Sequence, residues 1–190
     1  MKAIQAPGTR AHGGQIWPLS VAAYRALGEA GLIPENTELL YGQVYQKMSK
    51  SPLHSALVRR LLRLLRQIVL PGRFVTSEQP ITCEDSEPEP DIAVICGAEE
   101  DFWQEHPRTA ELVIEICVTS HEFDRAKLAA YARAGVKECW LVLGPEKLVE
   151  AHLRPVDGKF SEKRTHGPGG QLTSSAVPEL SLALNTLFSK

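Results

Sequence analysis

The sequence predicts a mixed α/β (α+β) fold in which helices flank a central mixed β-sheet. Apolar runs typical of strands recur along the chain at residues 73–83, 91–96, 111–118, 138–143 and 147–153. A helical pattern separates the third run from the fourth. The strand, helix and strand at 111–118, 122–134 and 138–143 have the length of a crossover unit. We therefore expect these two strands to be parallel or near neighbours in one sheet.

Two short elements are expected before this sheet. Ser20 is a suitable N-cap for a helix that follows it, and Gly31 can end that helix. Residues 38–45 have the pattern of two strands around a tight turn at Gly42. The sequence therefore predicts an N-terminal helix followed by a hairpin.

A long helix is predicted between two clear boundary signals. Ser51-Pro52 places a capping residue before a proline at the first helical position, and Pro71-Gly72 can stop the helix. Its apolar positions follow the helical period at Leu57, Val58, Leu61, Leu62, Leu65, Ile68 and Val69. Polar residues gather on the other side at Arg59, Arg60, Arg63, Arg66 and Gln67. That side is either a solvated helix face or a surface that contacts phosphates, and both interpretations stay open.

The C-terminal part is predicted to hold a loop and a short helix. Residues 155–170 are polar and rich in glycine, which indicates a hairpin loop. The segment 177–188 is apolar again, and we expect it to close the fold as a short helix.

Composition narrows the class of protein. The 190 residues are 43% hydrophobic, so we expect one domain over residues 17–190 behind a flexible leader of residues 1–16. A formal charge of −2 and a pI near 6.3 give no overall attraction to nucleic acid, so such a partner needs a local basic surface. No stretch approaches the roughly 20 apolar residues of a membrane span, and we expect a cytoplasmic protein with no membrane partner.

The four cysteines are expected to be reduced packing residues. They are scattered through strand-like segments as Cys83, Cys96, Cys117 and Cys139. Neither a C-x-x-C pair nor clustered histidines accompany them, which disfavours a zinc site.

Three charged residues occupy positions where the local pattern calls for an apolar side chain. Asp91 opens one strand-like run, and Glu115 interrupts the next. Lys127 lies in the middle of the apolar stripe of helix 122–134. Because burial of an unpaired charge is costly, we expect two buried acids and one buried base to compensate one another at one site, with or without a metal ion.

Each of these three residues also has a plainer interpretation. Lys127 could cover apolar surface with its methylenes and extend its ammonium into water. Glu115 could form a structural ion pair, and Asp91, which follows Pro90, could be a turn residue. The segment 119–122 fits a capping box at the start of the helix that carries Lys127.

The chemistry available to such a group is hydrolysis of phosphodiesters. Two carboxylates can hold a hard divalent cation such as Mg²⁺ or Mn²⁺, with a backbone carbonyl and waters completing the shell. A neighbouring lysine can orient or deprotonate the attacking water, or stabilise the negative charge that develops on the phosphoryl oxygens.

Over roughly residues 17 to 188 the chain resembles the Uma2 family, a bacterial group of the PD-(D/E)xK superfamily of restriction-endonuclease-like proteins. The segments that carry the resemblance are Glu38–Gly42, Ser51–His54, Glu89–Val94, Leu112–Ile116 and Asp124–Val142. The last segment is the most specific. The resemblance implies a restriction-endonuclease-like fold, a Mg²⁺ or Mn²⁺ cofactor, and nucleic acid, namely DNA, as the partner.

The resemblance also implies roles for individual residues. Asp91 corresponds to the superfamily aspartate and Glu115 to the acid of the second motif. The lysine that most members carry two residues after that acid corresponds here to Lys127 on the next helix, and Cys117 stands in its usual place.

Further site residues follow from the same resemblance. Glu38 is implied as an additional acid near the metal, and His54 as a contributor, although the sequence alone fits a capped core histidine equally well. The Ile116 carbonyl is the expected third metal ligand beside the two acids. Gln43 stands where the family often carries an acid, which disfavours a second metal ion.

Two functions remain in competition. The first is a metal-dependent nuclease that hydrolyses phosphodiester bonds of DNA. The second is a non-catalytic binding or assembly module of the same fold, in which the charged residues form an ion-pair cluster. A homo-oligomer is expected in either case, and a serine or cysteine hydrolase is disfavoured because no G-x-S-x-G turn is present.

Overall fold

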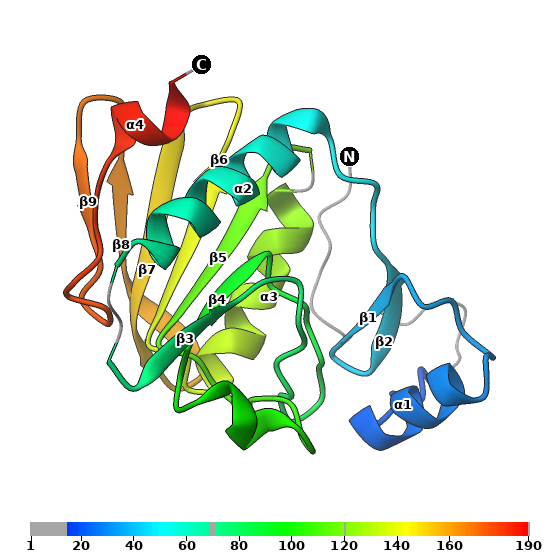
Figure 1. Ribbon diagram of the computed structural model, residues 1–190. Helices are drawn as coiled ribbons and strands as arrows, with labels where there is room; N and C mark the ends of the chain where they lie inside the picture. The colour runs from blue at the N-terminus through cyan, green and yellow to red at the C-terminus, as the bar shows by residue number, and fades with distance from the viewer. Residues whose placement is uncertain (1–14, 69–70, 120, 190) are drawn as a thin grey trace.

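A six-stranded sheet forms the centre of the computed structural model, which describes residues 15–68, 71–119 and 121–189 (Figure 1). The spatial order of the strands, β3-β4-β5-β6-β7-β8, is also their order in the chain. The strands are β3 (Arg73–Thr76), β4 (Ile92–Cys96), β5 (Leu112–Cys117), β6 (Glu138–Leu143), β7 (Leu148–Val156) and β8 (Lys159–His166).

The predicted crossover unit is confirmed. Strands β5 and β6 pair in parallel, from Leu112 opposite Glu138 to Cys117 opposite Leu143, whereas the other neighbouring strands of this sheet are antiparallel. Helix α3 (His121–Arg133) makes the connection that a parallel pair requires. The predicted class, a mixed sheet flanked by helices, is confirmed as well.

Helices cover both faces of the sheet. In Figure 1, α2 (Pro52–Arg66) crosses in front of the sheet and α3 lies behind it. Successive side chains of β5 point alternately to these two layers. Those on the α2 side are Leu112, Ile114 and Ile116, and those on the α3 side include Val113 and Cys117. Glu115 therefore extends from a fully buried strand toward α3.

Helix α2 begins as predicted and ends earlier than predicted. The Ser51 side chain caps it by accepting a hydrogen bond from the His54 N–H, at 3.2 Å. The helix stops at Arg66, because the N–H groups of Gln67 and Ile68 bond to carbonyls three residues back and tighten the last turn. Proline is therefore not what ends this helix.

The N-terminal helix and hairpin are present and lie beside the main sheet (Figure 1). They comprise α1 (Val21–Glu29), β1 (Thr37–Leu40) and β2 (Gln43–Gln46). The Ser20 side chain caps α1 by accepting from the Ala23 N–H at 3.1 Å, as predicted. A bridge between Leu39 and Glu87 joins the hairpin to the segment that precedes β4.

Two sequence-based predictions about strands were wrong. The predicted strand 73–83 stops at Thr76, because Glu78 adopts a φ of 56° and Pro80 has no N–H to donate to a neighbouring strand. The predicted loop 155–170 contains strand β8, which pairs with β7. Its polar, exposed side chains gave no strand pattern.

The C-terminal segment is more complex than the predicted single helix. Two short strands, β9 (Gln171–Thr173) and β10 (Ser181–Ala183), pair with each other, and α4 (Leu184–Phe188) follows and packs on α2. All four cysteines are free as predicted, but Cys96 is exposed and is not a packing residue.

Some predictions fall on residues outside the described part of the chain. These are the leader over residues 1–14, Val69 of the helical stripe and Ser120 of the capping box. Within the described residues, none of the helices is both long and apolar enough to cross a membrane.

Candidate functional site

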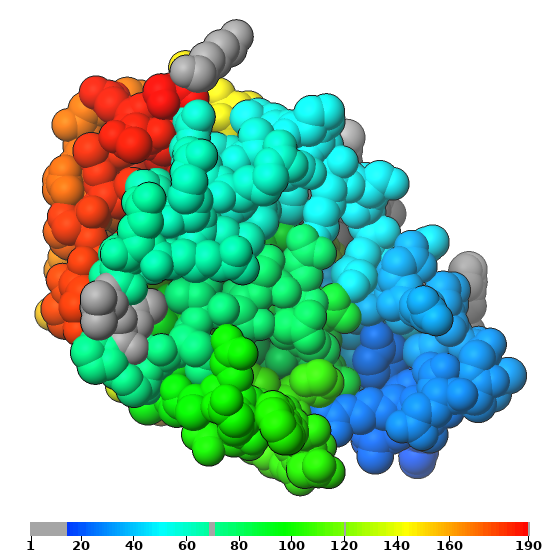
Figure 2. Space-filling model, in the orientation of Figure 1, coloured from blue at the N-terminus to red at the C-terminus, as the bar shows by residue number. Residues whose placement is uncertain are grey.

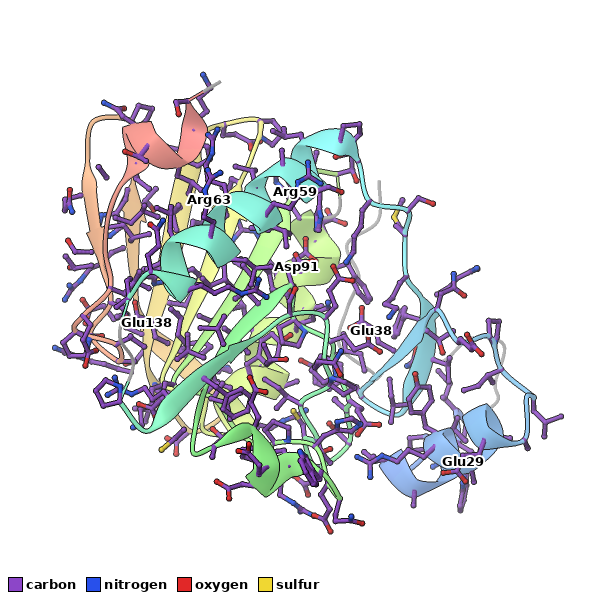
Figure 3. All side chains as sticks on the ribbon, in the orientation of Figure 1. Glu29, Glu38, Arg59, Arg63, Asp91 and Glu138 are labelled. Atoms are coloured by element: carbon purple, nitrogen blue, oxygen red, sulfur yellow. The ribbon has the colours of Figure 1, made fainter. Side chains whose placement is uncertain are left out.

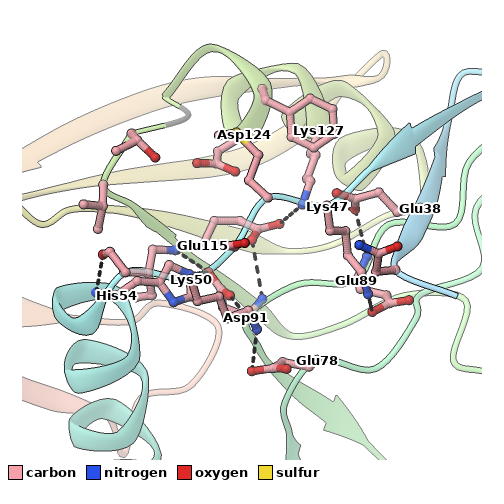
Figure 4. A pocket seen from close by; sticks show the side chains of 18 of the residues that line it. Glu38, Lys47, Lys50, His54, Glu78, Glu89, Asp91, Glu115, Asp124 and Lys127 are labelled. Carbon is pink, nitrogen blue, oxygen red and sulfur yellow. Dashed lines mark hydrogen bonds and ion pairs between the residues drawn. The ribbon is translucent and has the colours of Figure 1, made fainter. Parts of the chain in front are cut away.

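A cavity of about 510 Å³ opens where the start of α2, the hairpin, the segment before β4, the end of β5 and the start of α3 meet. It brings together all six residues that the sequence and its family resemblance single out, which are Glu38, His54, Asp91, Glu115, Ile116 and Lys127. Figure 4 labels all of them except Ile116. The catalytic and metal-binding roles of these residues stay predictions, whereas their proximity is an observation.

Asp91 is positioned by the point at which strand pairing stops. Strands β4 and β5 pair as far as Ile92 and Ile114, so the N–H of Ile116 has no backbone partner on β4. The Asp91 carboxylate replaces that partner, because its Oδ2 accepts from the Ile116 N–H at 2.7 Å. The same oxygen lies 3.0 Å from His54 Nε2, while Oδ1 faces Lys50 Nζ at 3.9 Å.

The Ile116 carbonyl faces the same edge of β5. In an antiparallel pair, the N–H and C=O of one residue point toward the same neighbouring strand. Because the Ile116 N–H is directed at Asp91, its carbonyl points toward the cavity side of β5 as well. The backbone geometry therefore suits the predicted role of this carbonyl as a ligand.

Glu115 is 2% exposed and is held by three donors. Its Oε1 accepts from the Tyr131 hydroxyl at 2.6 Å and lies 3.4 Å from Lys127 Nζ, and its Oε2 lies 3.4 Å from the Asp91 N–H. Burial raises the pKa of Glu115 above its ordinary value, and the nearby Asp91 adds to the rise while Lys127 opposes it.

Lys127 is 4% exposed, so its side chain does not extend into water. Its Nζ lies between two buried carboxylates, 3.1 Å from Glu38 Oε2 and 3.4 Å from Glu115 Oε1 (Figure 4). Burial lowers the pKa of Lys127, but the two carboxylates outweigh burial and raise it above its ordinary value. The lysine is therefore a stable ammonium at neutral pH.

Comparison with known proteins assigns the family. The family model described as "Uma2: Putative restriction endonuclease" matches residues 32–185. The chain belongs to the Uma2 family. A solved structure described as "a putative nuclease belonging to DUF820 from Anabaena variabilis ATCC 29413" shares the fold, with a TM-score of 0.76 and 22% sequence identity over 90% of this chain and 98% of that one. No curated protein matches the sequence.

The Lys127 that lines the cavity of this Uma2 chain comes from α3. Cys117 occupies the position two residues after Glu115, and its side chain joins the apolar core on the α3 side. The Lys127 ammonium nevertheless reaches Glu115 from the helix.

The Glu38 side chain lies in the cavity because the hairpin that carries it is bound to the segment before β4. Its Oε2 accepts from the Glu89 N–H at 3.2 Å while it also pairs with Lys127. Lys47 of the hairpin side forms an ion pair with Glu89. The hairpin is therefore part of the site of this Uma2 chain and not an appendage.

Sequence reasoning missed two residues that contact the predicted ones. Tyr131 donates to Glu115, and Lys50 lies between Asp91 and Glu78, at 3.9 Å and 2.5 Å from their nearest oxygens. Tyr131 follows Lys127 by four residues on the same helix stripe, which is the signal that could have identified it. Lys50 lies in a segment without periodicity and gave no such signal.

His54 lies in the first turn of α2 with one ring nitrogen on Asp91. Its other nitrogen, Nδ1, is buried and has no hydrogen-bond partner within the described residues. The ring and the Ile116 N–H therefore contact the same oxygen, Oδ2, of the Asp91 carboxylate.

The donors of the cavity fit a hard divalent cation. Two carboxylates lie side by side, and their mutual repulsion, which contributes to the raised pKa of Glu115, is what a bound cation would relieve. Among the described residues no group of three or more His, Cys, Asp and Glu side chains is arranged to hold a metal ion. A cation bound by Asp91, Glu115 and the Ile116 carbonyl, as predicted from the sequence, would have a set of oxygens that suits Mg²⁺ or Mn²⁺ with waters.

Proposed function

We propose that this protein is a metal-dependent nuclease that hydrolyses phosphodiester bonds of DNA. The observation that supports the proposal most strongly is the buried acid pair, Asp91 and Glu115, beside the Lys127 ammonium in one open cavity. Family membership and the shared fold agree with a nuclease. The Uma2 assignment alone leaves the metal and the substrate to experiment.

Each residue has a role that follows from its contacts. Asp91 and Glu115 would hold Mg²⁺ or Mn²⁺, which supplies an activated water and positive charge at the phosphoryl oxygen when bound. Lys127 acts as an electrostatic stabiliser and not as a base, because its two carboxylate partners keep it protonated. Glu38 fixes the position of that ammonium, and His54 fixes the orientation of Asp91.

Cleavage assays test the proposal. Purified protein should nick supercoiled DNA with Mg²⁺ or Mn²⁺, and Asp91→Asn and Lys127→Met should each lower the rate by about two orders of magnitude. Glu29→Gln on exposed α1 and Lys159→Met on exposed β8 are the matched controls and should keep the wild-type rate. Cleavage at one rate by wild type and both site variants would contradict the proposal.

The alternative is a binding or assembly module without catalysis. One observation favours it, since Glu38 and Glu115 already compensate Lys127 without an ion. Calorimetric titration separates the two functions. Heat on addition of Mn²⁺ to wild type that is lost in Asp91→Asn supports the nuclease, and the absence of heat at millimolar Mn²⁺ supports the module.

A further inference from the structure

The outer face of α2 carries three arginines that have no partner within the described residues. Most other described arginines form ion pairs with carboxylates, namely Arg25, Arg73, Arg108, Arg125, Arg133, Arg154 and Arg164. Arg60 donates instead to backbone carbonyls near the C-terminus. Among the residues that the structure describes, Arg59, Arg63 and Arg66 make neither a hydrogen bond nor an ion pair.

These three residues, the arginine face, lie on one line along the helix. Their spacing of four and three residues places them within a sector of about 60° at 100° per residue. The buried side chains of α2, which include Leu57, Leu61 and Leu65, point to the opposite side and pack on the sheet. The arginine face is therefore directed away from the core.

The arginine face begins about one and a half turns beyond His54 along α2, on the side of the helix away from the His54 side chain. His54 in the first turn of the helix lines the cavity, and Arg66 ends the same helix, about 18 Å further along its axis at 1.5 Å per residue. Figure 3 shows Arg59 and Arg63 on α2 and Asp91 near the N-terminal half of the helix. In Figure 2, the outer side of α2 is not covered by another element.

We propose that the arginine face binds the phosphate backbone of duplex DNA. Within residues 15–68, 71–119 and 121–189 the three guanidinium groups have no acidic partner, and they form a local basic surface on a chain whose net charge is −2. The face spans about 10 Å along the helix, and phosphates of one DNA strand recur every ~3.4 Å of duplex axis, so it covers about three phosphates. Arginine also binds phosphate oxygens in bidentate geometry.

The proposal rests on the proposed function for its choice of DNA, and its test does not require cleavage. Binding of a fluorescent 20-base-pair duplex is measured by anisotropy in a chelator, over a series of salt concentrations. The variant is R59Q/R63Q/R66Q. The control R108Q/R154Q/R164Q removes the same charge from side chains that are 76%, 74% and 57% exposed elsewhere on the surface.

The arginine-face variant should bind at least tenfold more weakly than wild type. The slope of log affinity against log salt should fall by about 3, since each lost phosphate contact removes about 0.9. The control should keep both the affinity and the slope near wild type. If the triple variant does not fold, each single Arg→Gln variant should lower the slope by about 0.9.

Three results would overturn the proposal. One is an equal loss of DNA affinity in the variant and the control, because the loss would then come from the change in net charge and not from the arginine face. Another is no binding of the duplex by wild type. The third is a change of mass in light scattering for the variant alone, which would make the face a contact between copies of the chain. If DNA binds through the arginine face but is not cleaved in Mg²⁺, the proposed nuclease activity is rejected and the proposed DNA-binding surface stands.

Discussion

The two carboxylate oxygens of Glu115 have different surroundings. Oε1 accepts a hydrogen bond from the Tyr131 hydroxyl and faces Lys127, whereas the one contact of Oε2 with a described residue is the long one of 3.4 Å to the Asp91 N–H. A carboxylate that is fixed through one oxygen keeps the other free for a ligand. Asp91 shows the same division, since its Oδ2 contacts Ile116 and His54 while Oδ1 has the distant Lys50.

Tyr131→Phe should therefore destabilise the protein by more than the free energy of a hydrogen bond between two neutral groups. The substitution removes a donor from a buried carboxylate and adds no volume, and we expect a loss of about 1.5–3 kcal/mol in the free energy of unfolding. Urea denaturation measures it. Tyr45→Phe, which removes a hydroxyl bonded to Gln43 at 3.1 Å on a half-buried residue, is the control and should cost less than about 1 kcal/mol. Equal losses would show that Tyr131 does not support Glu115.

Lys127→Met should be costly because it leaves two carboxylates buried without their cation. We expect a loss of about 3–5 kcal/mol in the free energy of unfolding. The double variant Lys127→Met/Glu38→Gln should recover part of that loss, since it removes one uncompensated charge. Chemical denaturation of both single variants and the double variant gives the coupling energy. A double variant whose loss equals the sum of the single losses would contradict the ion pair.

The predictability of the site depends on the chemical type of each residue. Asp91, Glu115 and Lys127 could be found from the sequence because a charge within an apolar pattern has few explanations. Tyr131 was harder to find, since an aromatic residue fits an apolar helix stripe and only its spacing of four residues from Lys127 connects it with the site. The contact between Asp91 and the Ile116 N–H depends on where strand pairing ends, which a sequence pattern does not specify.

At the scale of elements, a tight turn could be predicted from the sequence only where apolar strands flank it on both sides. The Gly42 turn was predicted because apolar residues flank it on both sides. The turn at Asp157 and Gly158, with φ values of 48° and 72°, has the same Asp-Gly chemistry, but the following strand β8 is polar and exposed. A hairpin with one apolar strand resembles a loop in the sequence, so β8 was missed.

Glycine substitutions test the hairpin that carries Glu38. Gly42 has a φ of 71°, and a Cβ there would lie 2.4 Å from the Pro18 Cβ, so Gly42→Ala should cost about 1–3 kcal/mol. Gly28 lies in α1 with no atom within 4 Å of an added Cβ, so Gly28→Ala should stabilise the protein by about 0.5–1 kcal/mol. Thermal unfolding measures both. Effects of the same sign would contradict this account.

At the scale of the whole molecule, the site exists because topology gathers distant segments. The β4–β5 pairing places Asp91 beside Ile116, the crossover brings α3 over β5, and the bridge at Leu39 brings the hairpin to the same place. The sequence predicts the crossover because its length and order are local. It does not predict the bridge, since the single pair of Leu39 and Glu87 gives no periodic signal.

A second polar group joins three elements on the α3 side of the sheet. Glu150 of β7 accepts hydrogen bonds from Arg125 of α3, lies 3.6 Å from Lys163 of β8 and contacts His152 at 3.4 Å. Hydrogen bonding by Arg125 lowers the pKa of Glu150 from 4.5 to about 2. The charged carboxylate therefore contributes to the attachment of α3 and β8.

The sign of the pKa shift fixes how this contribution depends on pH. A carboxylate whose pKa is lower in the folded state stabilises that state above its unfolded pKa and loses the effect as pH falls toward the folded value. Glu150→Gln should thus be less stable than wild type by about 1 kcal/mol at pH 7. The difference should stay constant down to about pH 5 and close between pH 4.5 and 2. Denaturation at several pH values measures it, and a difference that persists at pH 2.5 would contradict an ionised Glu150 as its source.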